Sequence, residues 1–187
     1  MRRTLATLAL LGVAACGSAE RLPASSTQAA SIGSGASSLA LTGRVVDAAQ
    51  VIDARDEQAL SAKLEALEQA TSDQMVVVTV ASLEGDTIEH KTMALGQKWG
   101  IGRADVDNGV IILVAPNDHK VRVEVGLGLE GLLTDAKAAE VITKMMPRFR
   151  QQDYAGGLNL GVDAIGLLLR SDRRRPQPRT TARKEAA

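Results

Sequence analysis

The stretch Asp105–Val125, with the sequence DVDNGVIILVAPNDHKVRVEV, decides the fold. Its centre, 109–115, is an unbroken apolar run, as in strands that are buried on both faces. A four-residue turn, 116–119, and Lys120 separate this run from a regular alternation of valine with Arg or Glu over 121–125. Two strands joined by so short a connection must be antiparallel. The stretch therefore predicts a buried strand followed by an edge strand with one polar face.

Helical and extended patterns alternate on both sides of this hairpin. Strands are predicted at 45–47 and 75–80, and helices after Asp53, over 88–99, after Thr134 and from about Asp153. Strands separated by helices, with one antiparallel edge hairpin, predict an α/β fold, a Rossmann-like three-layer α/β/α sandwich with a mixed sheet. Ligands of such sheets collect at the carboxyl ends of the parallel strands, and we expect the acidic residues near 105 to lie beside that edge.

Charge divides the chain into an acidic domain and a basic tail. Residues 43–170 hold 13 Lys and Arg against 19 Asp and Glu, a balance of −6, whereas the residues after 170 hold 6 basic and 2 acidic ones. An acidic domain with only 2% aromatic residues offers little attraction for phosphate backbones or bases. We therefore expect no nucleic-acid partner. The basic tail, 171–187, is either simply solvated or in contact with anionic lipid.

The first sixteen residues have the features of an export signal. A basic start is followed by an apolar run, 5–15, that is too short to span a bilayer. The run ends in Val13-Ala14-Ala15-Cys16, which resembles the lipobox of bacterial lipoproteins, in which the cysteine is lipidated. The alternative is an ordinary signal peptide that happens to end before a cysteine. Cys16 is the only cysteine of the chain, which favours lipidation and membrane lipid as a partner.

The predicted organisation is a lipoprotein signal peptide (1–16), a flexible Ser, Ala and Gly-rich tether (17–41), one globular domain (42–170) and the basic tail (171–187). Gly17 stands where sorting signals of this kind place aspartate for retention in the inner membrane. By that resemblance the domain lies on the periplasmic side of the envelope, anchored in the outer membrane rather than the inner one.

Two loops carry oxygen-bearing side chains. Asp105, Asp107 and Asn108 precede the buried strand, and Glu130 and Asp135 lie in the glycine-rich loop region after the hairpin. Calcium takes six to eight oxygen ligands, mainly carboxylates, carbonyls and water. If the loops are neighbours, their mutual repulsion favours a bound divalent cation. The alternative is structural, because Asn108-Gly109 is a favoured turn pair and Asp135 can stabilise a helix N-terminus.

The domain resembles the TPM domain family, which includes thylakoid-lumen acid phosphatases and many secreted bacterial proteins. The segments that carry the resemblance are Gly43–Asp47, Trp99–Gly102, Asp107–Val110, Val123–Gly126 with Leu133–Asp135, and Asp153–Gly157. The resemblance implies a Rossmann-like sandwich, a divalent cation, usually calcium, at an acidic cluster, and acid phosphatase activity in some members. The chain departs from a common family layout in which a transmembrane helix follows the domain.

The sequence leads to two hypotheses about function, one enzymatic and one non-enzymatic. In the first, a metal-bound water attacks a phosphoester, with Asp107 as the best catalytic candidate. In the second, the domain is a chaperone-like or assembly module for envelope membrane proteins. No Cys-x5-Arg loop or P-loop is present, and the spacing of Gly126, Gly128 and Gly131 follows an edge strand, so we expect no nucleotide cofactor. His90 and His119 are expected to be solvated, and Tyr154 to pack or to lie near the acidic cluster.

Overall fold

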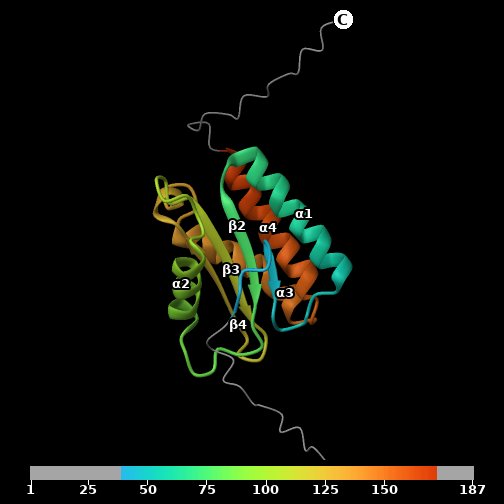
Figure 1. Cartoon of the computed structure of the whole chain (residues 1–187). Coiled ribbons are helices and arrows are strands. Elements are labelled where there is room, and N and C mark those ends of the chain that lie inside the picture. The colour runs from blue at the N-terminus through green and yellow to red at the C-terminus, as the bar shows by residue number, and fades with distance from the viewer. Residues whose placement is uncertain (1–38, 172–187) are drawn as a thin grey trace, which may run out of the picture. The chain divides into compact units, whose positions relative to one another are not determined.

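The computed structural model describes residues 39–171, which form a three-layer α/β/α sandwich (Figure 1). The middle layer is one four-stranded sheet in the order β1-β2-β3-β4. Its strands are β1 (Val45–Asp47), β2 (Gln74–Thr79), β3 (Gly109–Ala115) and β4 (Lys120–Val125). The helices are α1 (Ala54–Thr71), α2 (Ile88–Trp99), α3 (Asp135–Phe149) and α4 (Tyr154–Ser171), with a short 3-10 helix, η1 (Leu127–Leu129). The predicted fold class is confirmed.

The hairpin of β3 and β4 is formed as predicted. Val110 lies opposite Val125 and Ala115 lies opposite Lys120, in antiparallel register. All seven residues of β3 are buried, whereas Val123 is the only fully buried residue of β4. β1, β2 and β3 are parallel to one another. The unbroken apolar run is therefore an inner strand, and the alternating run is the edge strand.

Two separate cores lie on the two faces of the sheet. Val77 and Ile112 face α1, α3 and α4, and their chain neighbours Val78 and Leu113 face α2. This alternation explains why β2 and β3 have no polar face, since helices cover both sides. The buried side chains that the helices contribute are mainly leucine, isoleucine, valine and methionine. Aliphatic residues thus build both cores of a chain that has few aromatic ones.

The topology differs from a doubly wound sheet in one respect. α1 and α2 each connect neighbouring parallel strands, and the strand order β1-β2-β3 runs in one direction, yet the two helices cover opposite faces. The two crossovers must therefore have opposite hands, although about 98% of such connections are right-handed. Because the strand order never reverses, this sheet lacks the switch point at which Rossmann folds open a ligand crevice.

Side-chain caps fix the starts of the helices. Asp53 Oδ1 accepts a hydrogen bond of 2.8 Å from the amide of Asp56 at the start of α1. Thr134 Oγ1 accepts one of 3.5 Å from the amide of Lys137 at the start of α3. The predicted starts of both helices, after Asp53 and after Thr134, are confirmed, and each of these residues caps its helix. Pro147 lies within α3, which ends at Phe149.

Several predictions concern parts of the chain outside residues 39–171. The lipobox with Cys16, nearly all of the tether and the basic tail belong to these parts, so lipidation and localisation stay predictions. Within residues 39–171, no helix is both long and apolar enough to cross a membrane.

Candidate functional site

Asp107 joins the two loops in which the sequence places acidic residues. Its carboxylate Oδ2 accepts a hydrogen bond of 3.0 Å from the amide of Leu127. Its carbonyl oxygen accepts another, also of 3.0 Å, from the amide of Gly128. The loops 103–108 and 126–130 are therefore neighbours, as the metal hypothesis requires. Together we name these two loops the acidic tip.

Close backbone contact explains the glycines of the second loop. A Cβ atom at Gly126 would overlap the carbonyl oxygen of Asp107, and one at Gly128 would overlap the carbonyl oxygen of Val106. Only residues without a side chain allow the loops to approach so closely. The glycine spacing that resembles a dinucleotide motif therefore reflects contact between two loops.

Asn108 is buried and has a structural role. Its Oδ1 accepts a hydrogen bond of 2.9 Å from the amide of Arg103, and its Nδ2 donates to the carbonyl of Ser72 and to Asp73 Oδ1, at 2.6 and 3.0 Å. These bonds tie the loop to the connection between α1 and β2. The expected Asn-Gly turn is wrong, because the turn spans residues 103–107, where the amide of Asp107 donates to the carbonyl of Arg103.

The remaining predicted ligands are exposed and separate. Asp105 forms an ion pair of 2.8 Å with Arg103 at the surface. Glu130 ends η1, and Asp135 is the first residue of α3, where its charge favours the helix N-terminus. Within residues 39–171, no group of three or more His, Cys, Asp or Glu side chains is arranged to hold a metal ion.

These contacts determine which oxygen atoms of the predicted ligands are free to bind calcium. Asn108 Oδ1 and Asp107 Oδ2 already accept backbone hydrogen bonds, so they are not free ligands. As arranged, the five predicted side chains do not surround one point with the six to eight oxygens that calcium takes. The calcium site stays a prediction, and no catalytic step is derived from it.

The acidic tip lies at the opposite edge of the sheet from the expected one. Asn108 directly precedes Gly109, the first residue of β3, and the tip therefore adjoins the amino end of that strand. The expectation of a site beside the carboxyl ends is wrong for these residues. Strand direction follows the chain, so residues that precede a strand lie at its amino end.

Other polar residues occupy the carboxyl edge of the sheet, and sequence reasoning missed them. Asp47, at the end of β1, accepts hydrogen bonds from the amides of Val51 and Ile52 at 3.2 and 2.8 Å, and from the hydroxyl of Thr79. Its position directly after the two valines of the short strand was the sequence signal that could have placed Asp47 at this edge. Asp47 thus stabilises the loop that leads to α1.

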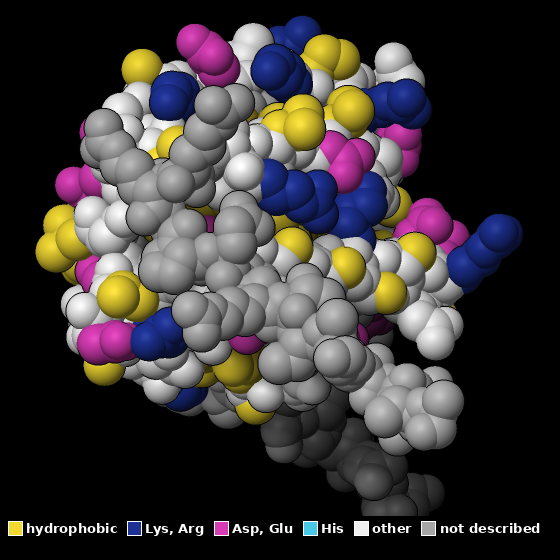
Figure 2. Space-filling model, turned by 90° about the horizontal axis from the view of Figure 1, so that it is seen from above, with side chains coloured by type: hydrophobic (Ala, Val, Ile, Leu, Met, Phe, Trp, Pro, Cys, Tyr) yellow, Lys and Arg dark blue, Asp and Glu magenta, His cyan; other side chains and the backbone are white. Residues whose placement is uncertain are grey.

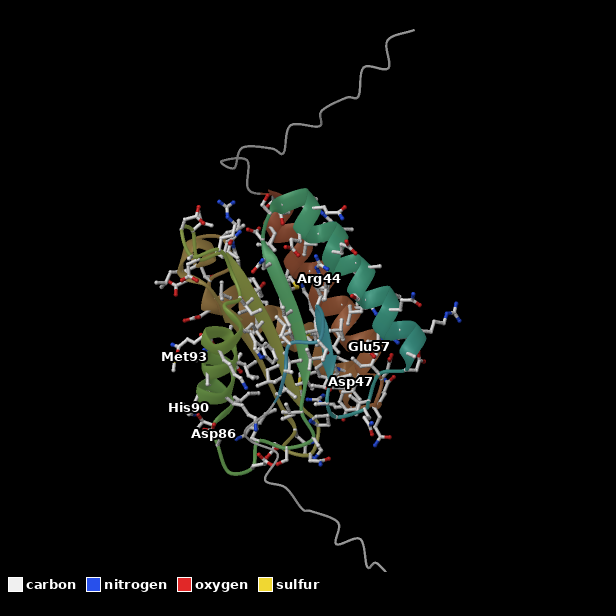
Figure 3. The ribbon with its side chains drawn as sticks, in the orientation of Figure 1. Arg44, Asp47, Glu57, Asp86, His90 and Met93 are labelled. Atoms are coloured by element: carbon white, nitrogen blue, oxygen red, sulfur yellow. The ribbon has the colours of Figure 1, made fainter. Side chains whose placement is uncertain are left out.

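Two further carboxylates stabilise the loop before α2. Asp118 accepts a hydrogen bond of 2.8 Å from the amide of Leu83, and this bond holds the pKa of the Asp118 carboxyl below its usual value. Asp86 and His90 lie side by side at the start of α2 (Figure 3), with 2.8 Å between Asp86 Oδ2 and His90 Nδ1. The hydrogen bond with His90 lowers the pKa of Asp86.

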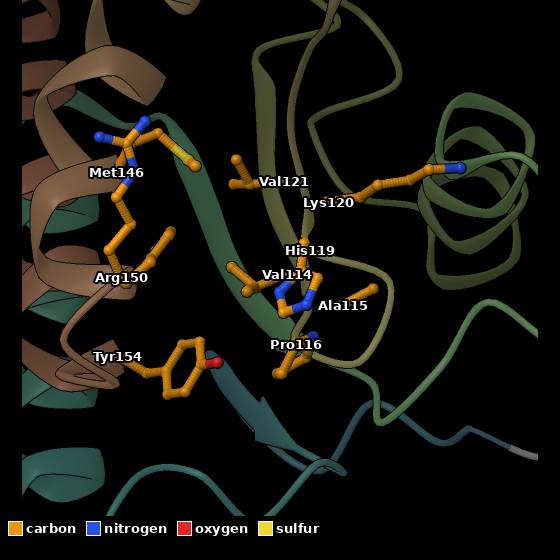
Figure 4. A pocket seen from close by; sticks show the side chains of 10 residues that line it. Val114, Ala115, Pro116, His119, Lys120, Val121, Met146, Arg150 and Tyr154 are labelled. Atoms are coloured by element: carbon orange, nitrogen blue, oxygen red, sulfur yellow. The ribbon is translucent and has the colours of Figure 1, made fainter.

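His119 and Tyr154 lie far from the acidic tip. Both line a pocket of about 260 Å³ at the carboxyl end of β3 (Figure 4). The ring of Tyr154 packs against Phe149 with 5.5 Å between ring centroids, so of the two roles expected for this tyrosine it has the packing role.

In the view of Figure 2, the side chains of Lys and Arg lie among those of Asp and Glu on the described surface, and hydrophobic side chains are scattered between them.

Comparison with known proteins agrees with this architecture, a three-layer α/β domain with an antiparallel edge hairpin. The family model of the TPM domain matches residues 45–167. The chain therefore belongs to the TPM domain family. No curated protein matches it.

Three solved structures share the fold. The N-terminal domain of a protein from P. gingivalis is 32% identical, with a TM-score of 0.64 over 68% of this chain and 82% of that one. The N-terminal domain of the cg2496 protein from Corynebacterium glutamicum is 21% identical, with a TM-score of 0.56 over 70% and 82%. The BA42 protein from Bizionia argentinensis is 20% identical, with a TM-score of 0.57 over 63% and 81%. The last two support the fold alone.

Proposed function

We propose that this chain is a lipid-anchored TPM domain of the cell envelope that binds a partner protein through its acidic tip. The observation that carries the proposal is a pair of exposed apolar side chains on two loops held together by Asp107. Val106 is 44% exposed and Leu127 is 74% exposed. Most large apolar side chains of the domain are buried, so two exposed ones on adjoining loops are a feature to explain.

The tip has the layout of a small recognition surface. The same two loops carry the charged side chains of Arg103, Asp105 and Glu130, which are all exposed. Interfaces commonly combine an apolar centre with a polar rim. The hydrogen bonds of Asp107 order the loops before binding, which reduces the entropy lost on association. The partner that fits is an envelope membrane protein with an apolar groove and a mixed-charge rim.

Phosphatase activity has less support from the geometry. Hydrolysis of a phosphoester needs a nucleophile or a metal-bound water. The tip contains no Ser, Thr or Cys, and its predicted ligands do not converge on one point. We therefore place the interaction function first and the enzymatic one second.

The interaction function is tested by purifying the anchored chain from its own membranes after chemical crosslinking. We expect one membrane protein to be enriched with the wild-type chain and to be lost with Leu127→Ser. Leu167→Ser is the matched control, because Leu167 is 69% exposed on α4 and belongs to neither loop of the tip. Equal enrichment with both variants would rule out the tip as the binding surface.

The anchor and the cation have tests of their own. Cys16→Ser is expected to release the protein from the membrane fraction, and its retention there would refute lipidation.

For calcium, exposed carboxylates supplemented by water predict a dissociation constant of about 1 mM. Calorimetric titration of the wild type and of Asp107→Ala checks this value, and equal binding by both proteins would exclude the tip as the site.

A further inference from the structure

The outer side of β4 is a free edge of the sheet. β4 stands last in the strand order, and β3 is the strand that pairs with it. The amide of Gly126 donates a hydrogen bond of 2.8 Å to the carbonyl of Gly109, which extends the antiparallel ladder of β3 and β4. Because hydrogen-bonded pairs alternate along such a ladder, every second residue of β4 points its amide and carbonyl away from β3. These residues are Val121, Val123 and Val125, and within residues 39–171 their outward groups have no hydrogen-bond partner.

The side chains of β4 divide between the two faces of the sheet. The three valines pack against the core that α1, α3 and α4 cover. Arg122 and Glu124 lie on the other face, where Arg122 Nη1 is 3.9 Å from Glu89 Oε1 of α2. Arg122 Nε and Nη2 both lie 3.0 Å from Glu124 Oε2, whereas no residue in the range 39–171 donates a hydrogen bond to Glu124 Oε1. The edge therefore carries one positive and one negative side chain, both partly exposed and two residues apart.

The order of these charges selects one register for a pair of β4 strands from two copies of the chain. In such an antiparallel pair, outward-facing residues must lie opposite each other, since their amides and carbonyls are the free ones. If Val123 lies opposite itself, Arg122 of each copy lies opposite Glu124 of the other. If Val121 lies opposite Val123, the two copies of Arg122 face each other, and if Val123 lies opposite Val125, the two acidic side chains do so. Opposite charges directly across two strands stabilise the pair and like charges destabilise it, so the first of these three registers is favoured.

We propose that the chain forms a two-fold symmetric dimer through the free edge of β4, with Val123 on the axis. Backbone hydrogen bonds of the three valines join the two sheets into one. Each Arg122 faces Glu124 of the other copy, whose Oε1 accepts a charge-assisted hydrogen bond from it. The same surface serves both copies, as in other two-fold dimers, and the pairing covers an edge that is open to other strands in the monomer. The proposal does not depend on the acidic tip.

The first test exchanges charges between two variants of the purified full chain, studied by sedimentation velocity over a range of concentrations. The wild type should form a dimer whose fraction rises with concentration. Arg122→Glu and Glu124→Arg each place like charges across the axis, so each variant alone should dimerise at least tenfold more weakly. In an equimolar mixture of the two variants every cross-strand pair again has opposite charges, and mixed dimers should form with an affinity within threefold of the wild type.

The mixture separates the interface from effects within one copy. Loss of the ion pair between Arg122 and Glu124 inside each chain is not repaired by mixing, whereas complementary edges are. A mixture that dimerises as weakly as its two components would overturn the proposal. A wild type that is monomeric at every concentration would also overturn it, and would show that the charges only guard the edge.

Arg55→Glu is the matched control for net charge. Arg55 is exposed at the start of α1, which packs against β1, β2 and α4. The substitution changes the charge by the same amount as Arg122→Glu, and its dimer should stay within twofold of the wild type in affinity. Equal losses in both variants would show a general charge effect and would refute the interface.

Hydrogen exchange tests the interface without any substitution. Raising the wild-type concentration through the range in which the dimer forms should slow amide exchange at least tenfold at Val121, Val123 and Val125, because these amides gain partners in the dimer. The amides of Arg122 and Glu124 already bond to β3 and should change less. Exchange at the three valines that is independent of concentration would contradict the proposal.

Discussion

At the scale of the residue, Asp107 and Asn108 act as connectors between loops. Asp107 holds a left-handed backbone conformation with φ of 47° and bonds to two amides of the second loop. Asn108 is buried and bonds to the end of α1, 36 residues away in sequence. Aspartate and asparagine are the side chains that best tolerate such backbone positions while accepting amide hydrogen bonds. The pair Asp107-Asn108, whose sequence suggests a metal site, therefore fixes the conformation of the loop backbone.

Substitution of Asp107 tests this structural role. Asp107→Ala keeps the left-handed strain and loses the acceptor for the amide of Leu127, so we expect a loss of about 1–2 kcal/mol in the free energy of unfolding. Asp107→Asn retains an acceptor oxygen and tolerates the same backbone angles, and it should lose less than half as much. Denaturant unfolding of the three proteins measures both changes. Equal losses would show that charge, and not the hydrogen bond, is what matters at Asp107.

At the scale of the element, the loop 126–131 shows why glycine position matters more than glycine spacing. Gly128 approaches the carbonyl of Val106, whereas a Cβ atom at Gly131 would meet nothing within 4 Å. The two residues belong to the same loop and differ only in what lies beside them. The contact with the first loop is therefore the constraint on this element.

The pair Gly128→Ala and Gly131→Ala isolates that constraint. The first substitution forces the loops apart, and we expect it to cost about 2–3 kcal/mol of stability. The second should stay within about 0.5 kcal/mol of the wild type, as exposed substitutions usually do. Thermal or denaturant unfolding gives both values. A neutral Gly128→Ala would mean that the loops are not packed as described.

The loop before α2 makes a prediction about acid stability. The pKa values of Asp86 and Asp118 are lowered from 3.8, by hydrogen bonds from His90 and from the amide of Leu83 respectively. A carboxylate whose pKa is lower in the folded than in the unfolded chain stabilises the fold at pH values above its pKa in the unfolded chain. This contribution is lost as the pH falls through its pKa in the folded chain. The double variant Asp86→Asn, Asp118→Asn should therefore be less stable than the wild type near about pH 7, and the difference should shrink as the pH falls below 3.8. A difference in unfolding free energy that stays constant as the pH falls would contradict this.

At the scale of the whole molecule, the sequence predicts the layers but not how the site is built. The pattern over 109–125 and the helix caps Asp53 and Thr134 are local signals, and the structure confirms them. The opposite hands of the two crossovers depend on which face each helix covers, and both faces of β2 are equally apolar. The partners of Asn108 are likewise distant in sequence. The edge at which the acidic tip lies could have been predicted, because Asp105–Asn108 precede the strand.

We propose that a lipid anchor at Cys16 holds a domain that presents Val106 and Leu127 to a partner. This central claim is tested most directly by placing a photocrosslinking amino acid at position 127 of the full chain in living cells. We predict one crosslinked product with a membrane protein, which disappears with Val106→Ser and is absent when the crosslinker is placed at position 167. Crosslinking at 167 but not at 127, or none at either position, would contradict the claim.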